Sequence, residues 1–578
     1  MSKKGFNSIA LEILWGRLIA ITDEMGATLH RTAFSTSARE GKDFTCVLLD
    51  AAGDSIAQLT RSVAAFSGVL PITTKHFLDA YPPDTLKPGD VLVTNDPWLA
   101  SGHLPDITTV APVFSNEKLV AFVGVVTHLP DIGGKQLSSD ASEVFEEGLQ
   151  IPMSKLYKEG KPNKDLFNII EHNVRVPDQV FGDLRAHVAA HDTGAKKLLE
   201  LMGEADLRDL SLLAQTIQDV SERAMRKAIS GIPDGDYHYE VYGDGFEELV
   251  RIKVKVSVKG DNIVVDYEGS SPQNPRGINA PLNHTYAYTM YAIKCALSPN
   301  IPNNEGFFKP IKVQAPQGCI LNAQPPAAVG GRHIVGQILP GAVFGALAPV
   351  LPEKIQAEYA SPNWVLCLHG QQDDGESFVI LPLLHGGQGA GKRQDGLPCI
   401  AFPSNSSDIP VEIIENQVPL LIKEKSMAVD SGGPGCFRGG CGEKYDIQLD
   451  SPYPIKLTAF VDKTKVAASG LFDGCSGASG SIKLNGKILA DPKEERFLQP
   501  GDCLELITPG GGGFGDPLER AVERVLADVF YGYVSLEQSE KEYGVIIDPT
   551  DWSVKGLSPK RLKRGESNVK GVSRGSGG

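Results

Sequence analysis

The chain has 578 residues, with 56 Lys and Arg against 71 Asp and Glu, which gives a formal net charge of −15 at pH 7. An acidic chain of this length lacks the basic footprint of a protein that binds nucleic acid or an anionic membrane surface. Hydrophobic residues make up 41% and charged residues 22% of the sequence, which is typical of globular proteins and excludes a chain that is disordered throughout. The length predicts about three to five domains or sub-domains.

The cysteines and the N-terminal segment indicate a cellular compartment. The nine cysteines are odd in number and include no Cys-x-x-Cys pair, so neither a disulfide framework nor a cysteine-based zinc site is expected. The apolar stretch near the N-terminus is interrupted by Glu12, Arg17, Asp23 and Glu24, so it cannot span a bilayer, and no signal-peptide core precedes it. The simplest interpretation is a soluble cytoplasmic protein with no membrane partner.

The hydrophobic pattern changes its period along the chain. Asn7 or Ser8 can cap a first helix, whose apolar positions Ile9, Ile13, Ile19 and Met25 fall roughly at helical spacing. Segments 44–49 and 91–94 are predicted to be strands, and the continuous apolar run 119–126 is predicted to be a strand buried on both faces. Residues from about 160 to 230 have a helical pattern. The later elements predicted are strands at 237–242, 250–258 and 262–267, a helix at 286–297, short glycine-punctuated strands beyond 426, and a helix at 518–530.

These elements predict an α+β protein with several domains. We expect mixed sheets with helices in the N-terminal half, and a β-rich, glycine-rich C-terminal half. The predicted divisions are an N-terminal α/β domain at 1–230, a central mixed domain at 231–425, a β-rich region with glycine loops and a C-terminal helix at 426–550, and a flexible tail at 551–578.

A short repeat carries the strongest chemical signal. His103-Leu-Pro-Asp-Ile recurs 25 positions later as His128-Leu-Pro-Asp-Ile. The second copy follows the predicted strand 119–126, and the first follows the strand 91–94 after a short loop. If the two strands are neighbours, two imidazoles and two carboxylates, from Asp106 and Asp131, meet at one edge of the sheet.

This set of side chains favours a divalent metal. Imidazole and carboxylate ligands suit Zn²⁺, Mn²⁺ or Fe²⁺, which can polarise a carbonyl or activate water. The alternative is that each His-x-x-Asp is a hydrogen-bonded pair that supports a turn, and the repeat alone leaves both interpretations open. Asp43, just before the strand 44–49, is a further candidate carboxylate, although the sequence alone favours a turn residue there.

Two glycine clusters and two histidines require interpretation. Residues 386–393 nearly match the phosphate-binding P-loop pattern, but Arg393 replaces the hydroxyl that would bind Mg²⁺ and no helix is predicted to follow, so a nucleotide site is rejected. Residues 509–517 could cradle an anion or admit another chain, although a structural turn is the more common role. His333 and His385 each stand near glycines and are possible proton carriers, although such histidines are usually structural.

Together these segments resemble the B subunit of the hydantoinase/oxoprolinase family over nearly the whole chain. The two His-Leu-Pro-Asp loops and the Pro-Gly-Gly-Gly-Gly loop carry most of this resemblance. The stretches that carry it are 40–46, 94–97 with 102–106, 127–134, 173–177 with 182–184, 430–435 with 438–440, and 508–517.

The resemblance implies one half of a two-subunit enzyme. In this family an A subunit with an actin-like fold uses ATP and Mg²⁺ to phosphorylate the carbonyl oxygen of the substrate, and the metal-containing B subunit is where the activated substrate reacts. Members open cyclic amides such as hydantoins, 5-oxoproline and lactams. The resemblance therefore implies an ATP-dependent cyclic amide hydrolase in an A2B2 heterotetramer. The rejected P-loop fits this division, because ATP need not bind this chain.

Carried over residue by residue, the resemblance implies one divalent metal (Zn, Mn or Fe) bound by His103, Asp106 and His128, with Asp43 as the acidic partner. Asp131 then becomes a candidate to orient an imidazole or to act as general base. The sequence departs from the family pattern at Gly41, at 64–68 and at His385, which bears on the identity of the substrate more than on metal binding.

Three other functions remain as alternatives. A sister branch, the acetone and acetophenone carboxylases, reacts an enol phosphate with CO₂, although its large subunits tend to be longer than this chain. A non-catalytic scaffold for the ATP-using subunit predicts no bound metal. A stand-alone metallohydrolase predicts activity without ATP or a partner.

Overall fold

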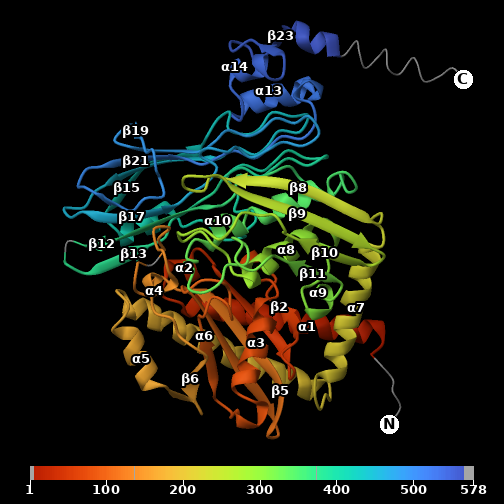
Figure 1. The fold of residues 1–578 in the computed structure, drawn as a ribbon, viewed down its shortest axis with the longest axis vertical. Coiled ribbons are helices and arrows are strands. Elements are labelled where there is room, and N and C mark those ends of the chain that lie inside the picture. The colour runs from red at the N-terminus through yellow and green to blue at the C-terminus, as the bar shows by residue number, and fades with distance from the viewer. Residues whose placement is uncertain (1–5, 136, 373, 565–578) are drawn as a thin grey trace, which may run out of the picture.

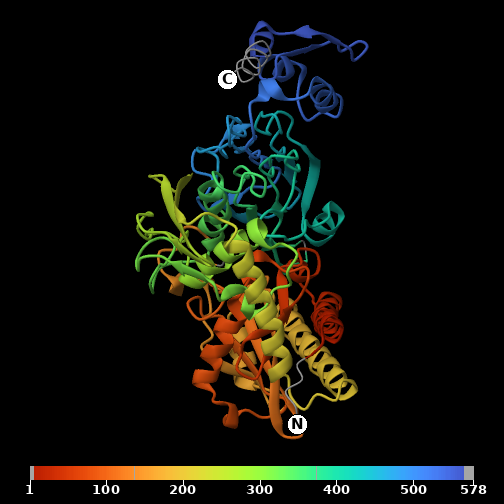
Figure 2. The ribbon, with the colours of Figure 1, turned by 90° about the vertical axis from the view of Figure 1, so that its right-hand side faces the viewer.

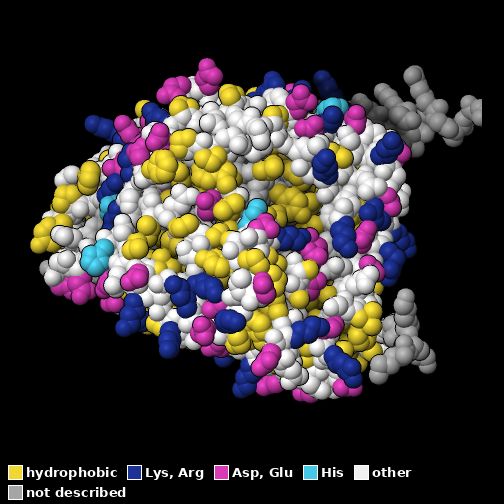
Figure 3. Space-filling model, turned by 60° about the horizontal axis from the view of Figure 1, so that its bottom comes forward, with side chains coloured by type: hydrophobic (Ala, Val, Ile, Leu, Met, Phe, Trp, Pro, Cys, Tyr) yellow, Lys and Arg dark blue, Asp and Glu magenta, His cyan; other side chains and the backbone are white. Residues whose placement is uncertain are grey.

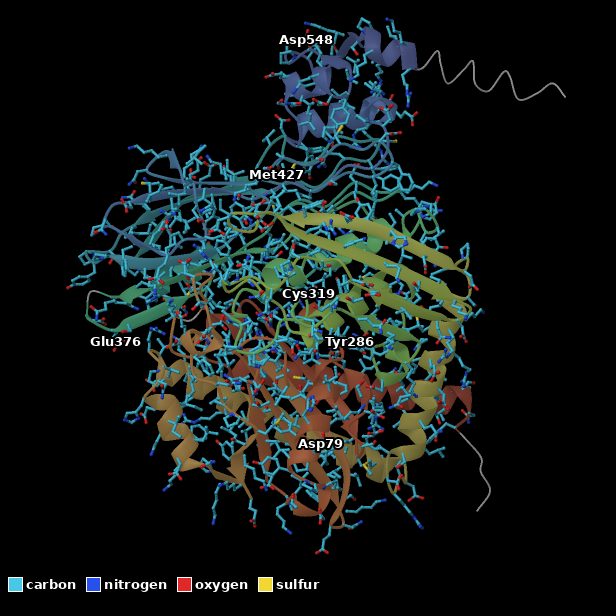
Figure 4. All side chains as sticks on the ribbon, viewed as in Figure 1. Asp79, Tyr286, Cys319, Glu376, Met427 and Asp548 are labelled. Carbon is cyan, nitrogen blue, oxygen red and sulfur yellow. The ribbon has the colours of Figure 1, made fainter. Side chains whose placement is uncertain are left out.

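The computed structural model describes residues 6–135, 137–372 and 374–564. Figure 1 shows a helix-rich N-terminal level at the bottom, a middle level in green, a β-rich level in teal and blue, and a small module at the top. The view in Figure 2 shows that this module projects from the rest of the molecule. The α+β class with several sheets is confirmed. Figure 4 labels side chains from bottom to top of the molecule, including Asp79, Tyr286, Cys319, Met427 and Asp548.

The N-terminal level is built on a seven-stranded antiparallel sheet with the strand order β2-β1-β5-β4-β3-β6-β7. The predicted strands at 44–49, 91–94 and 119–126 are confirmed and lie in this sheet. The long strand β4, next to β5, was not predicted. The strands are β1 (Phe44–Asp50), β2 (Ser55–Gln58), β3 (Val91–Thr94), β4 (Asp106–Ser115), β5 (Lys118–His128), β6 (Ser154–Lys158) and β7 (Lys161–Pro162).

Both faces of this sheet are buried, as the continuous apolar run of β5 predicted. Along β1, Cys46 and Leu48 belong to one hydrophobic core, which also contains side chains of the first and sixth helices. Val47 and Leu49 belong to a second core on the other face, which extends into the middle level of the molecule. Because successive strand residues point to opposite faces, the strand must be apolar at nearly every position. The sheet is therefore packed against hydrophobic side chains on both of its faces.

The first helix begins where its cap predicted, because the Asn7 side chain accepts a hydrogen bond from the Ala10 amide at 2.8 Å. Its buried stripe differs from the predicted one. Of the predicted positions Met25 is buried, whereas Ile9 and Ile13 are 70% and 58% exposed. Beside Met25 the helix buries Leu14, Leu18, Ile21 and Leu29 against the sixth helix and the sheet. The helices of this level are α1 (Ser8–Thr32), α2 (Thr36–Arg39), α3 (Val69–Ala80), α4 (Val144–Glu147), α5 (Lys164–Glu171), α6 (Pro177–Glu204) and α7 (Ser211–Ile229).

The middle level contains the predicted three-stranded meander, extended by a fourth strand. Strands β8, β9 and β10 pair antiparallel, and β11 joins β10 in parallel. The predicted helix at 286–297 is confirmed and begins four residues earlier. The elements are β8 (Gly235–Gly243), β9 (Val250–Lys259), β10 (Asn262–Asp266), β11 (Ile311–Gln314), α8 (Leu282–Leu297), α9 (Glu305–Phe308), α10 (Arg332–Gly336) and α11 (Leu339–Leu347).

The β-rich level contains two five-stranded sheets, and both cross the domain boundary predicted at 425/426, since strand β15 of one sheet spans Leu420–Met427. Strand β12 pairs with β17 along residues 365–369 and 456–460, so the central and C-terminal regions share a sheet. The elements are β12 (Trp364–Gln371), β13 (Ser377–Ile380), β14 (Leu383–Leu384), β17 (Ile455–Phe460), β20 (Arg496–Leu498), then β15 (Leu420–Met427), β16 (Glu443–Leu449), β18 (Ser481–Leu484), β19 (Lys487–Ile488), β21 (Cys503–Ile507) and α12 (Val411–Gln417).

The glycine clusters pack against one another as extended segments. The Gly511 amide donates to the Gly440 carbonyl at 3.0 Å, and the Gly440 amide donates to the Gln388 carbonyl at 2.7 Å. A Cβ atom at Gly511 would lie 2.2 Å from the Gln388 carbonyl oxygen. Glycine is therefore required because backbones approach one another closely. Residues 386–393 form part of this packing and no helix follows them, in agreement with the rejected nucleotide site.

The projecting module follows residue 516 and contains the predicted C-terminal helix in a shorter form. Val554–Leu557 forms a strand that pairs with Val545–Ile547, so the tail expected from residue 551 does not begin there. Residues 565–578 lie outside the described part of the chain. The module contains a 3₁₀ turn (Pro517–Glu519), α13 (Val522–Phe530), α14 (Leu536–Lys541), β22 (Val545–Ile547) and β23 (Val554–Leu557).

The surface and the thiols agree with the composition. On the face drawn in Figure 3, Lys and Arg side chains lie among Asp and Glu side chains, and hydrophobic side chains gather near the middle. All nine cysteines are free thiols, as their count and spacing predicted. Among the helices that the structure describes, none combines the length and the apolar character needed to cross a bilayer.

Candidate metal centre

The two His-Leu-Pro-Asp copies meet because their strands form a hairpin. Strand β4 begins at Asp106, strand β5 ends at His128, and these two residues are paired across the antiparallel strands. His103 lies in the loop that leads into β4. The predicted convergence at one edge of the sheet is therefore observed for three of the four repeat side chains.

The three side chains form a compact, buried cluster. His103 Nε2 lies 2.8 Å from Asp106 Oδ1, and His128 Nδ1 lies 3.0 Å from the same oxygen. One candidate ligand atom from each residue lies within 4.8 Å of the other two. The side chains of His103, Asp106 and His128 are 4%, 1% and 8% exposed. Two nitrogens and one carboxylate oxygen at this spacing form a partial coordination shell for a divalent ion.

The hydrogen bonding of His103 fits a metal ligand. Its Nδ1 lies 3.0 Å from the Gly330 carbonyl oxygen, and because a carbonyl can only accept, Nδ1 carries the proton. Burial, and then the positive charge of Arg332, lowers the pKa of His103 to about 4, so the ring is neutral and Nε2 has a lone pair. This lone pair makes no hydrogen bond although Asp106 Oδ1 is near. Two buried acceptors at this distance repel each other unless a cation lies between them.

Asp106 is held by groups on the side away from the imidazoles. Its Oδ2 accepts a hydrogen bond from the Ser101 hydroxyl at 2.7 Å and contacts the Arg332 guanidinium. Burial raises the pKa of Asp106, but the positive charge of Arg332 opposes this effect, and that pKa is held well below its usual value. The carboxylate is therefore ionised, with Oδ1 turned toward the two histidines. Arg332 comes from α10, and no sequence motif indicated it.

Asp43 lines the same cavity but does not belong to the compact cluster. Its backbone carbonyl accepts the His128 amide at 3.0 Å, which places it next to the end of β5. Burial raises the pKa of Asp43 to about 6, while His128 lowers it and Asp106 raises it by smaller effects. A carboxylate with this pKa can accept a proton near neutral pH. Its role as a metal ligand stays a prediction.

The structure does not bring Asp131 to the cluster. Its buried carboxylate accepts hydrogen bonds from the Gly133 amide at 2.9 Å and from the Arg175 guanidinium at 2.8 Å. Asp131 is not among the described residues that line the cavity at the metal cluster. The second copy of the repeat therefore uses its aspartate to fix the loop that follows β5. The position of Asp131 does not support the catalytic role that was predicted for it.

The cluster lies in the wall of a cavity of about 80 Å³. The N-terminal, middle and β-rich levels all contribute residues to the lining of this cavity. Four polar atoms of its described lining residues lack hydrogen-bond partners: His103 Nε2, Arg332 Nε, His333 Nε2 and Asn363 Oδ1. The sequence named His333 only as a possible proton carrier and gave no signal for Asn363. His385 lines a separate pocket. The lining residues are Ser37, Gly41, Asp43, Val63, Ala65, Phe66, His103, Asp106, His128, Leu137, Tyr288, Arg332, His333, Gln337, Asn363, Val365, Leu381, Leu383, Ser404, Ser406 and Ile409.

Glu147 supports the peptide that orients His103. Its Oε1 accepts the Gly330 amide at 2.6 Å, and the carbonyl of the same glycine accepts the His103 Nδ1 proton. Glu147 Oε2 is buried without a partner. Burial raises the pKa of Glu147 to about 8, and the amides of Gly330 and Val329 oppose that rise.

We expect Glu147→Gln to flatten the dependence of stability on pH. Because the folded protein holds this proton up to about pH 8 and the unfolded chain releases it near pH 4.5, stability falls as the pH rises between these values. A glutamine at position 147 keeps an oxygen that can accept the Gly330 amide, but its side chain does not ionise. Thermal unfolding should give similar midpoints at pH 5, and a midpoint about 1–3 °C higher for the variant at pH 8.5. A variant that unfolds at a lower temperature at pH 8.5 would contradict this explanation.

Comparison with known proteins identifies the family. The sequence model of the Hydantoinase B/oxoprolinase family matches residues 7–517. The chain belongs to this family. Among its members, the B subunit of a putative D-/L-hydantoinase from Pseudomonas sp. is 30% identical over 95% of this chain and 96% of its own length.

Two solved structures share the fold over almost the whole chain. The ATP-dependent caprolactamase from Pseudomonas jessenii superposes with a TM-score of 0.88 and 28% identity, covering 97% of this chain and 99% of that one. An acetone carboxylase in its nucleotide-free state superposes with a TM-score of 0.87, covering 99% of this chain and 84% of that one, but at 20% identity. The second likeness concerns the fold alone. The resemblance seen in the sequence motifs is thus confirmed, and the family contains hydrolases of cyclic amides.

Proposed function

We propose that this chain is the metal-binding half of a two-subunit enzyme that opens a cyclic amide ring at the expense of ATP. The partner would be an A subunit with an actin-like fold that phosphorylates the amide oxygen, in an A2B2 assembly. The observation that carries the proposal is the lone pair of His103 Nε2, which faces Asp106 in a buried cavity with no donor to satisfy it. Membership in a family with hydantoinase and caprolactamase subunits supports the same reaction class.

The residues of the cavity would divide the work as follows. His103, Asp106 and His128 would hold one Zn, Mn or Fe ion, which when bound lowers the pKa of water toward 7. Asp43 would take the proton that the attacking water releases, since its pKa of about 6 leaves it ionised at neutral pH. Arg332 would keep Asp106 ionised and fixed in orientation. The Gly330 carbonyl would keep His103 in the tautomer that exposes the Nε2 lone pair.

The ring nitrogen needs a proton when the C–N bond breaks. His333 Nε2 is buried, lies in the lining and has no hydrogen-bond partner. Burial, and then the charge of Arg332, holds the pKa of His333 well below its usual value, so this imidazole is neutral and is not the donor. Asp43, once it has taken the proton from water, would return it to the leaving nitrogen. The water oxygen would first bond to the activated carbon, and the C–N bond would then break as the nitrogen takes this proton, which leaves an acyl phosphate. A second water would then release phosphate and give the ring-opened amino acid.

Removal of the metal tests this proposal directly. We expect the purified complex of this chain with its A subunit to contain about one Zn, Mn or Fe per copy of this chain. A chelator should abolish ring opening, one of these ions should restore it, and no ring should open without ATP. Ring opening that survives chelation would contradict the metal role, and opening without ATP or partner would favour a stand-alone hydrolase. No bound metal and no effect of chelation would favour the scaffold.

The carboxylase branch is distinguished by its co-substrate. It requires bicarbonate or CO₂ and a ketone, whereas amide hydrolysis requires neither. ATP consumption by the complex with acetone or acetophenone that depends on bicarbonate, together with failure to open any cyclic amide, would replace the proposed function with that one.

A further inference from the structure

One turn of the backbone, residues 329–332, contacts two of the three candidate metal ligands. The Gly330 carbonyl oxygen lies 3.0 Å from His103 Nδ1, and the Arg332 guanidinium contacts the Asp106 carboxylate. The turn is closed by the Arg332 amide, which donates to the Val329 carbonyl at 3.0 Å. Because both contacts come from one short segment, a shift of this turn displaces the partners of His103 and Asp106 together.

Glu147 is the side chain that anchors this turn. Its Oε1 accepts the Gly330 amide at 2.6 Å, and its side chain is buried, with 1% of the residue exposed. Among the described residues, the one charged side chain that shifts its pKa is Glu146, another acid. A carboxyl group buried without a cation is unfavourable for stability. Its place in the fold is therefore explained by the amide that it holds rather than by an ion pair.

The backbone around Glu147 is itself tied to both sides of the site. Glu147 is the last residue of α4, and the Val144 amide at the start of this helix donates to the Pro326 carbonyl at 2.9 Å. After the helix, the Leu149 amide donates to the Ile132 carbonyl at 2.8 Å. The helix thus connects the segment that leads into the turn 329–332 with the loop that follows β5.

The orientation of the His103 ring depends on this turn. The bond from Nδ1 to the Gly330 carbonyl is the one hydrogen bond of the ring to the described part of the chain, because Nε2 makes none. A ligand histidine is commonly held by such a bond to its second nitrogen, and loss of the group that fixes the ring weakens metal binding. Removal of the Glu147 anchor would free the turn and, with it, the ring.

We propose that Glu147 is a positioning residue of the metal centre. By anchoring the Gly330 amide, it holds the turn 329–332 where Gly330 orients His103 and Arg332 orients Asp106. Glu147 would not touch the ion, and its effect would reach the ion through these two ligands. The inference rests on the proposed function and names a residue that determines how tightly the ion is held.

The affinity for the ion tests this role. The complex of this chain with its A subunit is freed of metal and titrated at pH 7 with Zn²⁺, Mn²⁺ or, without oxygen, Fe²⁺, in competition with a chelator of known affinity. We expect Glu147→Ala to raise the dissociation constant by about 10–100-fold. An unchanged constant in folded Glu147→Ala would overturn the inference. A wild-type complex that binds none of these ions would instead refute the proposed function.

Glu147→Gln is the conservative variant that should rescue binding. Because burial raises the pKa of Glu147 to about 8, the wild-type side chain is mostly neutral at pH 7, and glutamine offers the Gly330 amide a neutral acceptor of the same length. The dissociation constant should stay within about 3-fold of wild type. A loss as large as that of Glu147→Ala would show that the hydrogen bond to Gly330 is not the cause, and would overturn the inference.

Two further acid-to-alanine changes separate positioning from a general loss of stability. Glu146 is the neighbour of Glu147 in α4 and pairs with Lys135. Asp90 is buried and anchors a different turn by accepting the Lys87 amide at 2.9 Å. Neither acid is among the described residues that line the metal cavity. Both variants should bind the ion as wild type does, even where Asp90→Ala lowers the thermal midpoint. Equal weakening in Asp90→Ala and Glu147→Ala would show that affinity merely follows stability.

Glu147→Asp keeps the inference testable if Glu147→Ala does not fold. Aspartate is one methylene shorter, so its carboxyl group cannot reach the Gly330 amide from the same backbone position, although the acidic group is kept. We expect the dissociation constant of the ion to rise by about 10-fold. A folded Glu147→Asp that binds the ion as tightly as wild type would overturn the positioning role.

Discussion

His103→Ala is expected to lose both the metal and the activity. The substitution removes one of three candidate ligands from a cluster whose atoms lie within 4.8 Å of one another, and the remaining pair cannot complete a tetrahedral shell. Because a metal ion supplies several kcal/mol of transition-state stabilisation, we expect kcat for ring opening to fall on the order of 10³-fold. Elemental analysis by plasma mass spectrometry should show the metal content falling from about one per chain to near zero.

The control for His103→Ala is another histidine-to-alanine change. His172 is exposed, its Nδ1 bonds the Asn168 carbonyl at the end of α5, and it is not among the described residues that line the cavity. His172→Ala should keep full metal content and activity, and circular dichroism should show that both variants are folded. A folded His103→Ala that still carries one metal per chain would contradict the assigned site.

The sequence predicted those site residues that lie next to the ends of paired strands. Strands β4 and β5 form a hairpin, so residues that precede one strand and end the other meet regardless of the rest of the fold. The repeat located His103, Asp106 and His128, although the sequence argument assumed that the strands 91–94 and 119–126 are neighbours. In the structure the unpredicted strand β4 lies between those two strands. The same logic failed for Asp131, because the chain turns after His128 and Arg175 from the segment before α6 takes its carboxylate. No spacing rule in the sequence indicated that pair.

The rest of the cavity depends on contacts that are remote in sequence. Arg332 reaches Asp106 from 226 residues away, and Asn363 and Leu383 enter from the β-rich level. Such contacts arise only when the three levels pack together, and hydrophobic periodicity describes elements rather than their packing. The missed strand β4 has a related cause, because it is buried along most of its length and lacks the alternation typical of a half-exposed strand.

Gly511→Ala is expected to destabilise the protein more than any surface change. A Cβ atom at this position would lie 2.2 Å from the Gln388 carbonyl oxygen and 2.4 Å from the Gln388 carbonyl carbon. These are backbone atoms that cannot rotate away, and the Gly511 amide and carbonyl are both hydrogen-bonded, to Gly440 and Gly433. Accommodating the methyl group must separate segments from three parts of the chain. We expect a loss of about 3 kcal/mol, at the upper end of the range for overpacked interiors.

A second glycine-to-alanine change separates this steric clash from the general effect of such a change, which is to reduce the conformational freedom of the unfolded chain. Gly16 lies inside α1, and a Cβ atom there would have nothing within 4 Å. Gly16→Ala should therefore stabilise the protein by about 0.5–1 kcal/mol through reduced freedom of the unfolded chain. Urea unfolding followed by circular dichroism should move the two midpoints in opposite directions. If Gly511→Ala unfolds at the wild-type midpoint, the glycine segments are not closely packed, and their sequence must serve another purpose, such as the anion cradle that the motif also allowed.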